Sequence, residues 1–214
     1  MTEPSIAPDR FDRILPLAGV LAGVLFFVGL VLLWNDPSTE TGPAETFAYW
    51  QNDRGQHQIV GLLVAPLIAF LLIFFGVGLQ RRLERGSRGS GHGQAAFGGA
   101  LLGATMFVLV GMLEAGMTNA AHEGEVKTVY ALNQFHSYDW LGWNVAFAAV
   151  LLSTGLGARR NRMLPTALAW ATIVVGASLL TPLGFFGFLL VPVWLIVVGL
   201  VLFRQDKPAH AVGA

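Results

Sequence analysis

The chain has 214 residues, of which 54% are hydrophobic and 12% are charged, and its mean hydropathy is +0.61. This composition excludes an ordinary soluble domain and is typical of an integral membrane protein. The formal net charge is zero, and we expect no nucleic-acid partner. The absence of cysteine from the sequence excludes disulfides, thiolate metal ligands and thiol catalysis.

Five apolar stretches are long enough to cross a bilayer, and the last is long enough to cross it twice. They cover residues 14–34, 58–79, 95–118, 141–156 and 163–203. The last stretch contains TPLG at 181–184, where proline and glycine favour a turn between two spans. Pro66 lies inside the second stretch and predicts a kink there. We therefore predict six spans.

The basic residues lie almost entirely on one side of these spans. Of the 13 Lys and Arg, only Arg54 and Lys127 fall in the loops of the other side. Because cytoplasmic loops carry an excess of Lys and Arg, both termini are expected in the cytoplasm of a multi-pass cell-membrane protein. The fold class is therefore an all-α transmembrane helix bundle over 14–203, flanked by cytoplasmic tails at 1–13 and 204–214.

Two segments of the outer loops have the spacing of short helices that lie in the membrane interface. PAETFAYWQND at 43–53 starts with proline and an early acid, and VKTVYALNQFHSYDW at 126–140 has apolar residues at helical intervals. Trp140 and Trp143 follow where an aromatic belt belongs. Interface anchoring is the favoured role of these aromatic residues, and a ligand cage is the alternative if the two loop helices pack together.

The polar residues that could carry chemistry gather at the outer ends of the spans. Glu114 lies about one turn inside the third span, and an ionisable residue in a span is a functional candidate. If the helix continues past Asn119, Glu114 and His122 share a face and point into an outward-facing cavity. Three residues from other span ends would join them there: His57, His136 and Asp139. The favoured alternative is a polar cap that closes the bundle.

Metal binding is a second hypothesis for the same residues. His57, His122 and His136, together with the carboxylates, are ligand types that zinc uses, but their spacing matches no established metal motif. No metal and no cofactor is therefore assigned. Asn144, deep in the fourth span, is expected to form an interhelical hydrogen bond and is a further candidate for ligand binding.

Small residues in two spans predict close helix contacts. Gly19 and Gly23 form a GxxxG pattern in the first span, and Gly99 and Gly103 continue such a pattern in the third. These glycines can pack helices within one chain or join two copies in a homo-oligomer.

The segments ETFAYWQNDRGQ, MLPTALAWATIVVG and TPLGFFGFLLVPVWLIVVGLVLFRQ resemble a group of small six-span bacterial membrane proteins that is common in actinobacteria. The resemblance covers most of the chain. It implies a six-span fold and assigns no catalytic or binding residue, because no function is attached to the group.

The sequence favours a non-enzymatic membrane protein that binds the bilayer and, on its outer side, a small or lipidic ligand or a membrane partner. The alternative is an outward-facing metal-binding protein or metal-assisted enzyme. The residues for that alternative are Glu114, His57, His122, His136 and Asp139.

Overall fold

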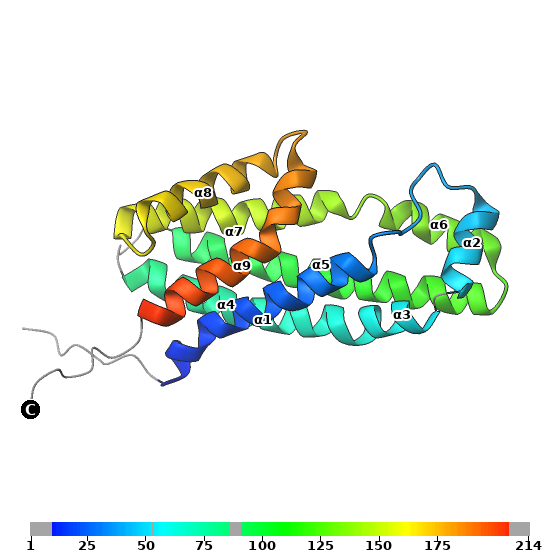
Figure 1. The fold of residues 1–214 in the computed structure, drawn as a ribbon, viewed down its shortest axis with the longest axis horizontal. Helices are drawn as coiled ribbons and strands as arrows, with labels where there is room; N and C mark the ends of the chain where they lie inside the picture. Colours follow the sequence, from blue (N-terminus) through cyan, green and yellow to red (C-terminus); the bar gives the residue numbers. More distant parts are fainter. Residues whose placement is uncertain (1–9, 53, 86–90, 206–214) are drawn as a thin grey trace, which may run out of the picture.

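The computed structural model describes residues 10–52, 54–85 and 91–205, and within them every regular element is helical (Figure 1). The parts of the predicted tails at 1–9 and 206–214, together with Arg88 and Lys207, lie outside the described residues. In chain order the elements are α1 (Arg10–Leu32), α2 (Pro43–Asn52), α3 (Arg54–Ile59), the π-helical turn η1 (Val60–Val64), α4 (Ala65–Arg85), α5 (His92–His122), α6 (Val126–His136), α7 (Trp140–Asn161), α8 (Thr166–Ser178) and α9 (Gly184–Gln205).

Five helical segments of the described chain are long and apolar enough to cross a membrane, as expected of a membrane protein. They are Phe11–Leu32, Arg54–Arg85, His92–His122, Val126–Asn161 and Gly184–Gln205. The remaining apolar helix, α8, has 13 residues and is therefore roughly 20 Å long, shorter than the ~30 Å hydrocarbon core of a bilayer. Helices also form at both predicted loop positions, as α2 and α6.

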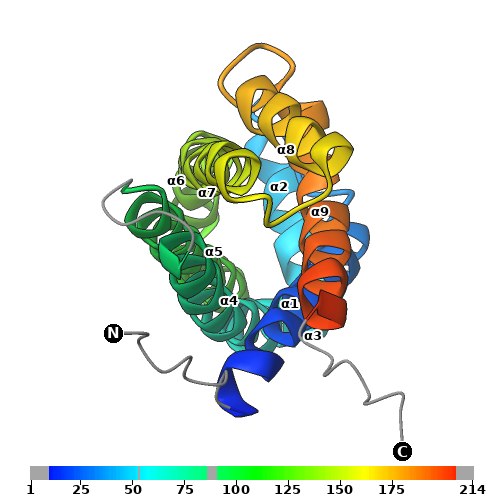
Figure 2. The ribbon, with the colours of Figure 1, turned by 90° about the vertical axis from the view of Figure 1, so that its left-hand side faces the viewer.

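The long helices form a ring in which neighbours in the sequence are neighbours in space (Figure 2). α1 packs against α4 and α9, α5 packs against α4 and α7, and α8 packs against α7. α1 starts and α9 ends at one end of the bundle, here the basal end, whereas α2, α3 and α6 gather at the opposite, distal end (Figure 1). The turn between α8 and α9 stops short of the distal end (Figure 1).

Glycines bring the helices of the ring into close contact within the chain. A Cβ atom on Gly23 would lie 2.6 Å from the carbonyl oxygen of Pro192, and one on Gly99 would lie 2.8 Å from that of Ala146. Gly19 packs in the same way against the ring of Phe75. Gly103 is buried as well, at ordinary van der Waals distances from its neighbours. Self-association of the chain through these glycines stays a prediction.

The sequence predicts a kink at Pro66, and the structure has a departure from regular α geometry directly before this residue. The departure is the π-helical turn η1, in which the N–H of Ala65 donates to the carbonyl oxygen of Val60. Proline has no N–H to donate and its ring crowds the carbonyl four residues earlier, so a wider turn directly before it relieves both problems. The three segments α3, η1 and α4 therefore form one continuous helical segment through the bundle.

A small second core fixes the distal end. Trp50 of α2 is fully buried against Met117 and Leu113 of α5 and Val129 of α6. Trp143 is also buried, in the main core, whereas Trp140 is half exposed. The expectation of interface anchoring is therefore wrong for Trp50 and Trp143. Periodicity identified the helices correctly, but it could not distinguish an aromatic face turned to lipid from one turned to α5.

Candidate functional site

Five titratable side chains from five different segments meet at the distal end. Asp36 lies in the turn after α1, His57 is on α3, Glu114 is on α5, His136 is the last residue of α6, and Asp139 directly precedes α7. We refer to these five residues as the acid–histidine cluster. Four of them were predicted as candidates, and the structure brings those four together.

The shortest contact in the cluster joins α3 to α5. His57 Nδ1 lies 2.7 Å from Glu114 Oε2, and both side chains are fully buried. Two glycines allow this approach: a Cβ atom on Gly111 would lie 2.3 Å from the carbonyl oxygen of Gly61 in η1. Because neither glycine carries a side chain, the backbones come close enough for His57 to reach Glu114.

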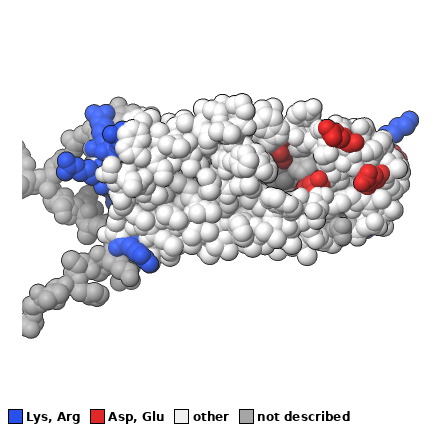
Figure 3. All heavy atoms as spheres, turned by 45° about the horizontal axis from the view of Figure 1, so that its top comes forward, with Lys and Arg blue, Asp and Glu red and all other residues white. Residues whose placement is uncertain are grey.

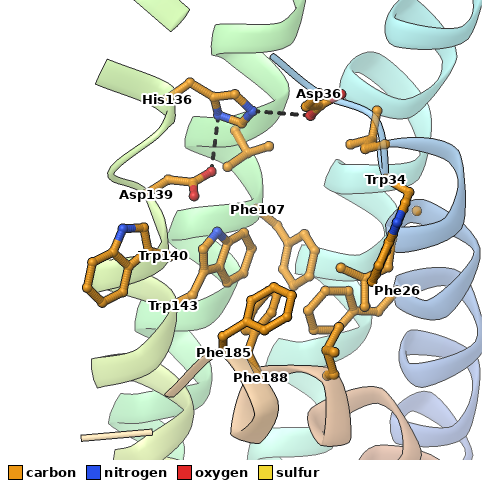
Figure 4. Close-up of a pocket in the computed structure, with 15 residues that line it drawn as sticks. Phe26, Trp34, Asp36, Phe107, His136, Asp139, Trp140, Trp143, Phe185 and Phe188 are labelled. Atoms are coloured by element: carbon orange, nitrogen blue, oxygen red, sulfur yellow. Dashed lines mark ion pairs between the residues drawn. The ribbon is translucent and has the colours of Figure 1, made fainter. Parts of the chain in front are cut away.

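His136 is the centre of the cluster. Its Nδ1 lies 3.1 Å from Asp139 Oδ2, and its Nε2 lies 3.7 Å from both Asp36 Oδ2 and Glu114 Oε1. Figure 4 shows the imidazole between Asp139 on one side and Asp36 on the other. The ring therefore presents one nitrogen to a single carboxylate and the other nitrogen to a pair of carboxylates.

Three residues of the cluster have the arrangement of metal ligands. One ligand atom each from Asp36, Glu114 and His136 can be chosen so that all three lie within 4.8 Å of one another. Glu114 Oε1 is buried and has no hydrogen-bond partner among the described residues. Two carboxylate oxygens and one imidazole nitrogen suit zinc and other divalent transition metals.

Each of these three residues is held from its other side. Tyr49 donates its hydroxyl to Asp36 Oδ1 over 2.6 Å, His57 contacts Glu114 Oε2, and Asp139 faces His136 Nδ1. In metal sites such outer partners fix the orientation of the ligands and the tautomer of the histidine. Hydrogen bonds supply such partners for Asp36 and Glu114, and an ion pair with Asp139 supplies one for His136.

Aromatic rings and amide hydrogen bonds enclose the cluster. The indole of Trp50 lies over the imidazole of His57, with ring centroids 4.3 Å apart. Trp50 Nε1 donates to Asn133 Oδ1 over 3.1 Å, and Asn133 Nδ2 donates to the carbonyl oxygen of Pro37 over 3.3 Å. α2, α6 and the segment after α1 are therefore tied together over the site.

A cavity of about 470 Å³ opens below the cluster. Asp36, His136 and Asp139 line its polar end. Aromatic rings from α1, α5, α7 and α9 line the rest, as Figure 4 shows: Phe26, Phe107, Trp143, Phe185 and Phe188.

Two predicted candidates lie elsewhere. His122 is exposed and outside the cluster, although α5 does continue past Asn119. Eight residues exceed two helical turns, so His122 is rotated by about 80° from Glu114. Asn144 is buried beside Gly184 of α9, and its Oδ1 has no hydrogen-bond partner in residues 10–52, 54–85 and 91–205. The expected interhelical hydrogen bond of Asn144 is therefore not formed through that oxygen.

Asp36 and Tyr49 were missed by the sequence reasoning. Asp36 occurs in WNDP, directly after the first span, in the same position relative to a span end as Asp139. That symmetry was the available signal for Asp36. The sequence contains no such signal for Tyr49, because its role depends on the packing of α2 against the segment that contains Asp36.

Comparison of the chain with protein-family models, with curated proteins and with solved structures finds no match. The resemblance to small six-span bacterial proteins therefore stays a prediction, and the functional argument rests on the geometry of the cluster.

Proposed function

We propose that the protein binds a divalent transition-metal ion in the acid–histidine cluster. Asp36, Glu114 and His136 supply the ligand atoms, and Tyr49, His57 and Asp139 orient them. This is the metal-binding alternative expected from the sequence, with Asp36 in the role that was considered for His122.

The observation that carries the proposal is the orphaned carboxylate oxygen of Glu114. Its partner oxygen is hydrogen-bonded to His57, while Oε1 is buried and faces His136 Nε2 at 3.7 Å. A buried carboxylate oxygen without a hydrogen bond is costly, and a cation bound by that oxygen would remove the cost.

Two of the three distances between the ligand atoms are close to those around a zinc ion, and the third is within 4.8 Å. With zinc–ligand bonds of about 2.1 Å in a tetrahedron, neighbouring ligand atoms lie about 3.4 Å apart. The two contacts of His136 Nε2, at 3.7 Å, exceed this value slightly. Three protein ligands also leave a fourth position of a tetrahedral ion open to water or to another ligand.

The proposal includes the orientation of the chain. Six spans, with α8 and the turn after it as a short fifth span, would place both termini in the cytoplasm and the cluster on the outer side, with α2 and α6 at the interface. The charge distribution supports this orientation: Figure 3 shows Lys and Arg mostly at the basal end and the acids toward the distal end. Cytoplasmic segments are enriched in Lys and Arg.

Metal analysis of the purified protein tests the proposal. The protein is equilibrated with Zn²⁺, passed over a desalting column and analysed for zinc by mass spectrometry. We expect one zinc per chain in the wild type and loss of zinc in Glu114→Gln and His136→Gln. Asp139→Asn should keep the ligands and weaken binding by roughly 10- to 100-fold, the usual effect of removing an outer partner.

His122→Gln is the matched control, because His122 is exposed on the same helix as Glu114. Zinc retained in this variant and lost in His136→Gln would support the cluster as the site. Zinc content that is independent of His136, or that is lost with His122, would contradict the proposal. Thermal unfolding of each variant without metal shows whether it is folded.

A further inference from the structure

We propose that the cavity below the cluster binds a single-chain amphiphile with a carboxylate head group, and that this binding depends on the metal ion. The inference rests on the proposed function and names the ligand class of the same site. Its arguments are the shape of the cavity, the charges at its polar end and the route by which a chain can enter.

The cavity suits one hydrocarbon chain. Its volume of about 470 Å³ lies within the range of roughly 300–1,000 Å³ that is typical of small-molecule sites. Below the polar end the lining is apolar and mostly aromatic, with Phe26, Phe107 and Phe188 facing the interior (Figure 4). A chain placed there would leave its head group beside Asp36 and His136.

The charges decide which head group fits. Asp36, Glu114 and Asp139 place three carboxylates around His136, and without a cation they repel an anionic head. A divalent ion among them reverses this preference, because the ion becomes the largest local charge and has a position left for an exogenous oxygen. The head group must also be small, since α2 and α6 are tied together over the cluster.

The chain can enter from the side of the bundle. A second groove, of about 880 Å³, shares Trp140, Phe185 and Phe188 with the cavity. Trp140 is 50% exposed and Phe185 is 60% exposed, and the other walls of the groove include exposed apolar side chains such as Leu141. In a membrane this groove would face acyl chains, so an amphiphile could slide past the shared aromatic residues.

Tryptophan quenching by brominated amphiphiles tests the inference, because Trp34, Trp140 and Trp143 line the cavity. The protein is placed in phosphatidylcholine nanodiscs, loaded with Zn²⁺, and desalted so that no free zinc can precipitate the probe. 12-Bromododecanoate should quench saturably, with an apparent Kd at least tenfold lower in the zinc-loaded protein than in chelator-treated protein. 12-Bromododecylamine should show no such gain with zinc.

Two glycine variants distinguish quenching by a probe bound in the cavity from quenching by a probe in the annular lipid. Gly29 lines the cavity and Gly98 is exposed on α5, and a Cβ atom at either position meets no atom within 4 Å. Gly29→Leu should fill the cavity and abolish the saturable quenching while zinc content is unchanged. Gly98→Leu should behave as the wild type in both measurements.

The outcomes distinguish this inference from the proposed function. If zinc binds but the carboxylate probe quenches equally with and without it, or quenches Gly29→Leu as it does the wild type, the amphiphile inference is wrong and the metal site stands. If zinc does not bind, both are wrong. If Gly29→Leu does not fold, the comparison of carboxylate and amine probes in the wild type still decides.

Discussion

Glu114 is a charged residue type in an apolar helix, and its two oxygens have different surroundings. Oε2 is 2.7 Å from His57 Nδ1, whereas Oε1 faces His136 and has no hydrogen bond within the described chain. A fully buried carboxylate is retained only if its surroundings compensate its loss of hydration. His57 supplies a hydrogen bond to one oxygen, and a metal ion shared with His136 would bind the other oxygen.

The approach of His57 to Glu114 depends on Gly111. Its missing side chain lets α5 lie directly against η1, where the carbonyl oxygen of Gly61 occupies the place a Cβ atom would need. Both contacting groups belong to backbone, so neither can move aside as a flexible side chain would. The pairing of the two titratable residues is therefore built on the close contact of two helices.

Gly111→Ala should destabilise the protein by about 1–3 kcal/mol, because the added methyl group overpacks the contact with η1. It should also weaken zinc binding at least tenfold, since Glu114 moves away from His57. Thermal unfolding in detergent and zinc titration measure the two effects.

Gly98→Ala is the control on the same helix, at a position with no neighbour within 4 Å. Replacing an exposed helical glycine by alanine should stabilise the helix by up to about 1 kcal/mol. Equal effects of the two substitutions would show that the contact between Gly61 and Gly111 does not constrain the site.

The helices α2 and α6 act as a clamp over the distal end. Asn133 of α6 connects α2 to the segment after α1, because it accepts a hydrogen bond from Trp50 and donates one to Pro37. Gln134 adds a second link through the carbonyl oxygen of Thr39. Asp36 lies directly before the segment so fixed, and its position relative to His136 therefore depends on these hydrogen bonds.

Trp50→Phe should loosen this clamp. It removes the indole donor and leaves Asn133 Oδ1 buried without that partner, which costs about 1–3 kcal/mol. Hydrogen exchange of the α6 amides should accelerate by roughly 5- to 150-fold if local opening governs exchange there.

α8 serves as the internal reference for exchange, since it does not contact Trp50 or Asn133. Trp140→Phe is the matched control, because Trp140 is half exposed. Exchange that is unchanged in α6, or accelerated equally in α8, would contradict the role assigned to Asn133.

The helices were predictable because apolar length and helical spacing are local properties of the sequence. The helices α2 and α6 follow from the same kind of signal, whereas Pro66 indicated a kink and not the π-helical turn that precedes it. The burial of α2 and α6 could not be predicted, because the sequence spacing around Trp50 is the same whether this side chain contacts lipid or α5. Burial is decided by which helix lies opposite.

The site was predictable in part for the same reason. His57, Glu114, His136 and Asp139 are conspicuous as polar residues at the ends of apolar stretches. Asp36 was missed because it lies in a turn, and its role appears only when the turn folds over His136. His122 was wrongly included because an interval of eight residues was treated as one helix face.

The exposed basic residues and the candidate site occupy opposite ends of the bundle. The basal end carries ion pairs of Asp12 with Arg81 and Arg85, in which both arginines are about half exposed. The distal end carries the acid–histidine cluster, which is largely enclosed. In a membrane the two ends of the bundle face opposite sides. The orientation of the chain therefore determines from which side the cluster can be reached.

Single cysteines can establish this orientation, because the native sequence contains none. Ser38 and Thr128 are exposed at the distal end, and Thr166 is exposed at the start of α8 at the basal end. In intact cells a membrane-impermeant maleimide should label Ser38→Cys and Thr128→Cys, whereas Thr166→Cys should be labelled only after lysis. The reason is the bias of Lys and Arg toward cytoplasmic segments. The reverse pattern would contradict the proposed orientation, because it would place the cluster on the cytoplasmic side of the membrane.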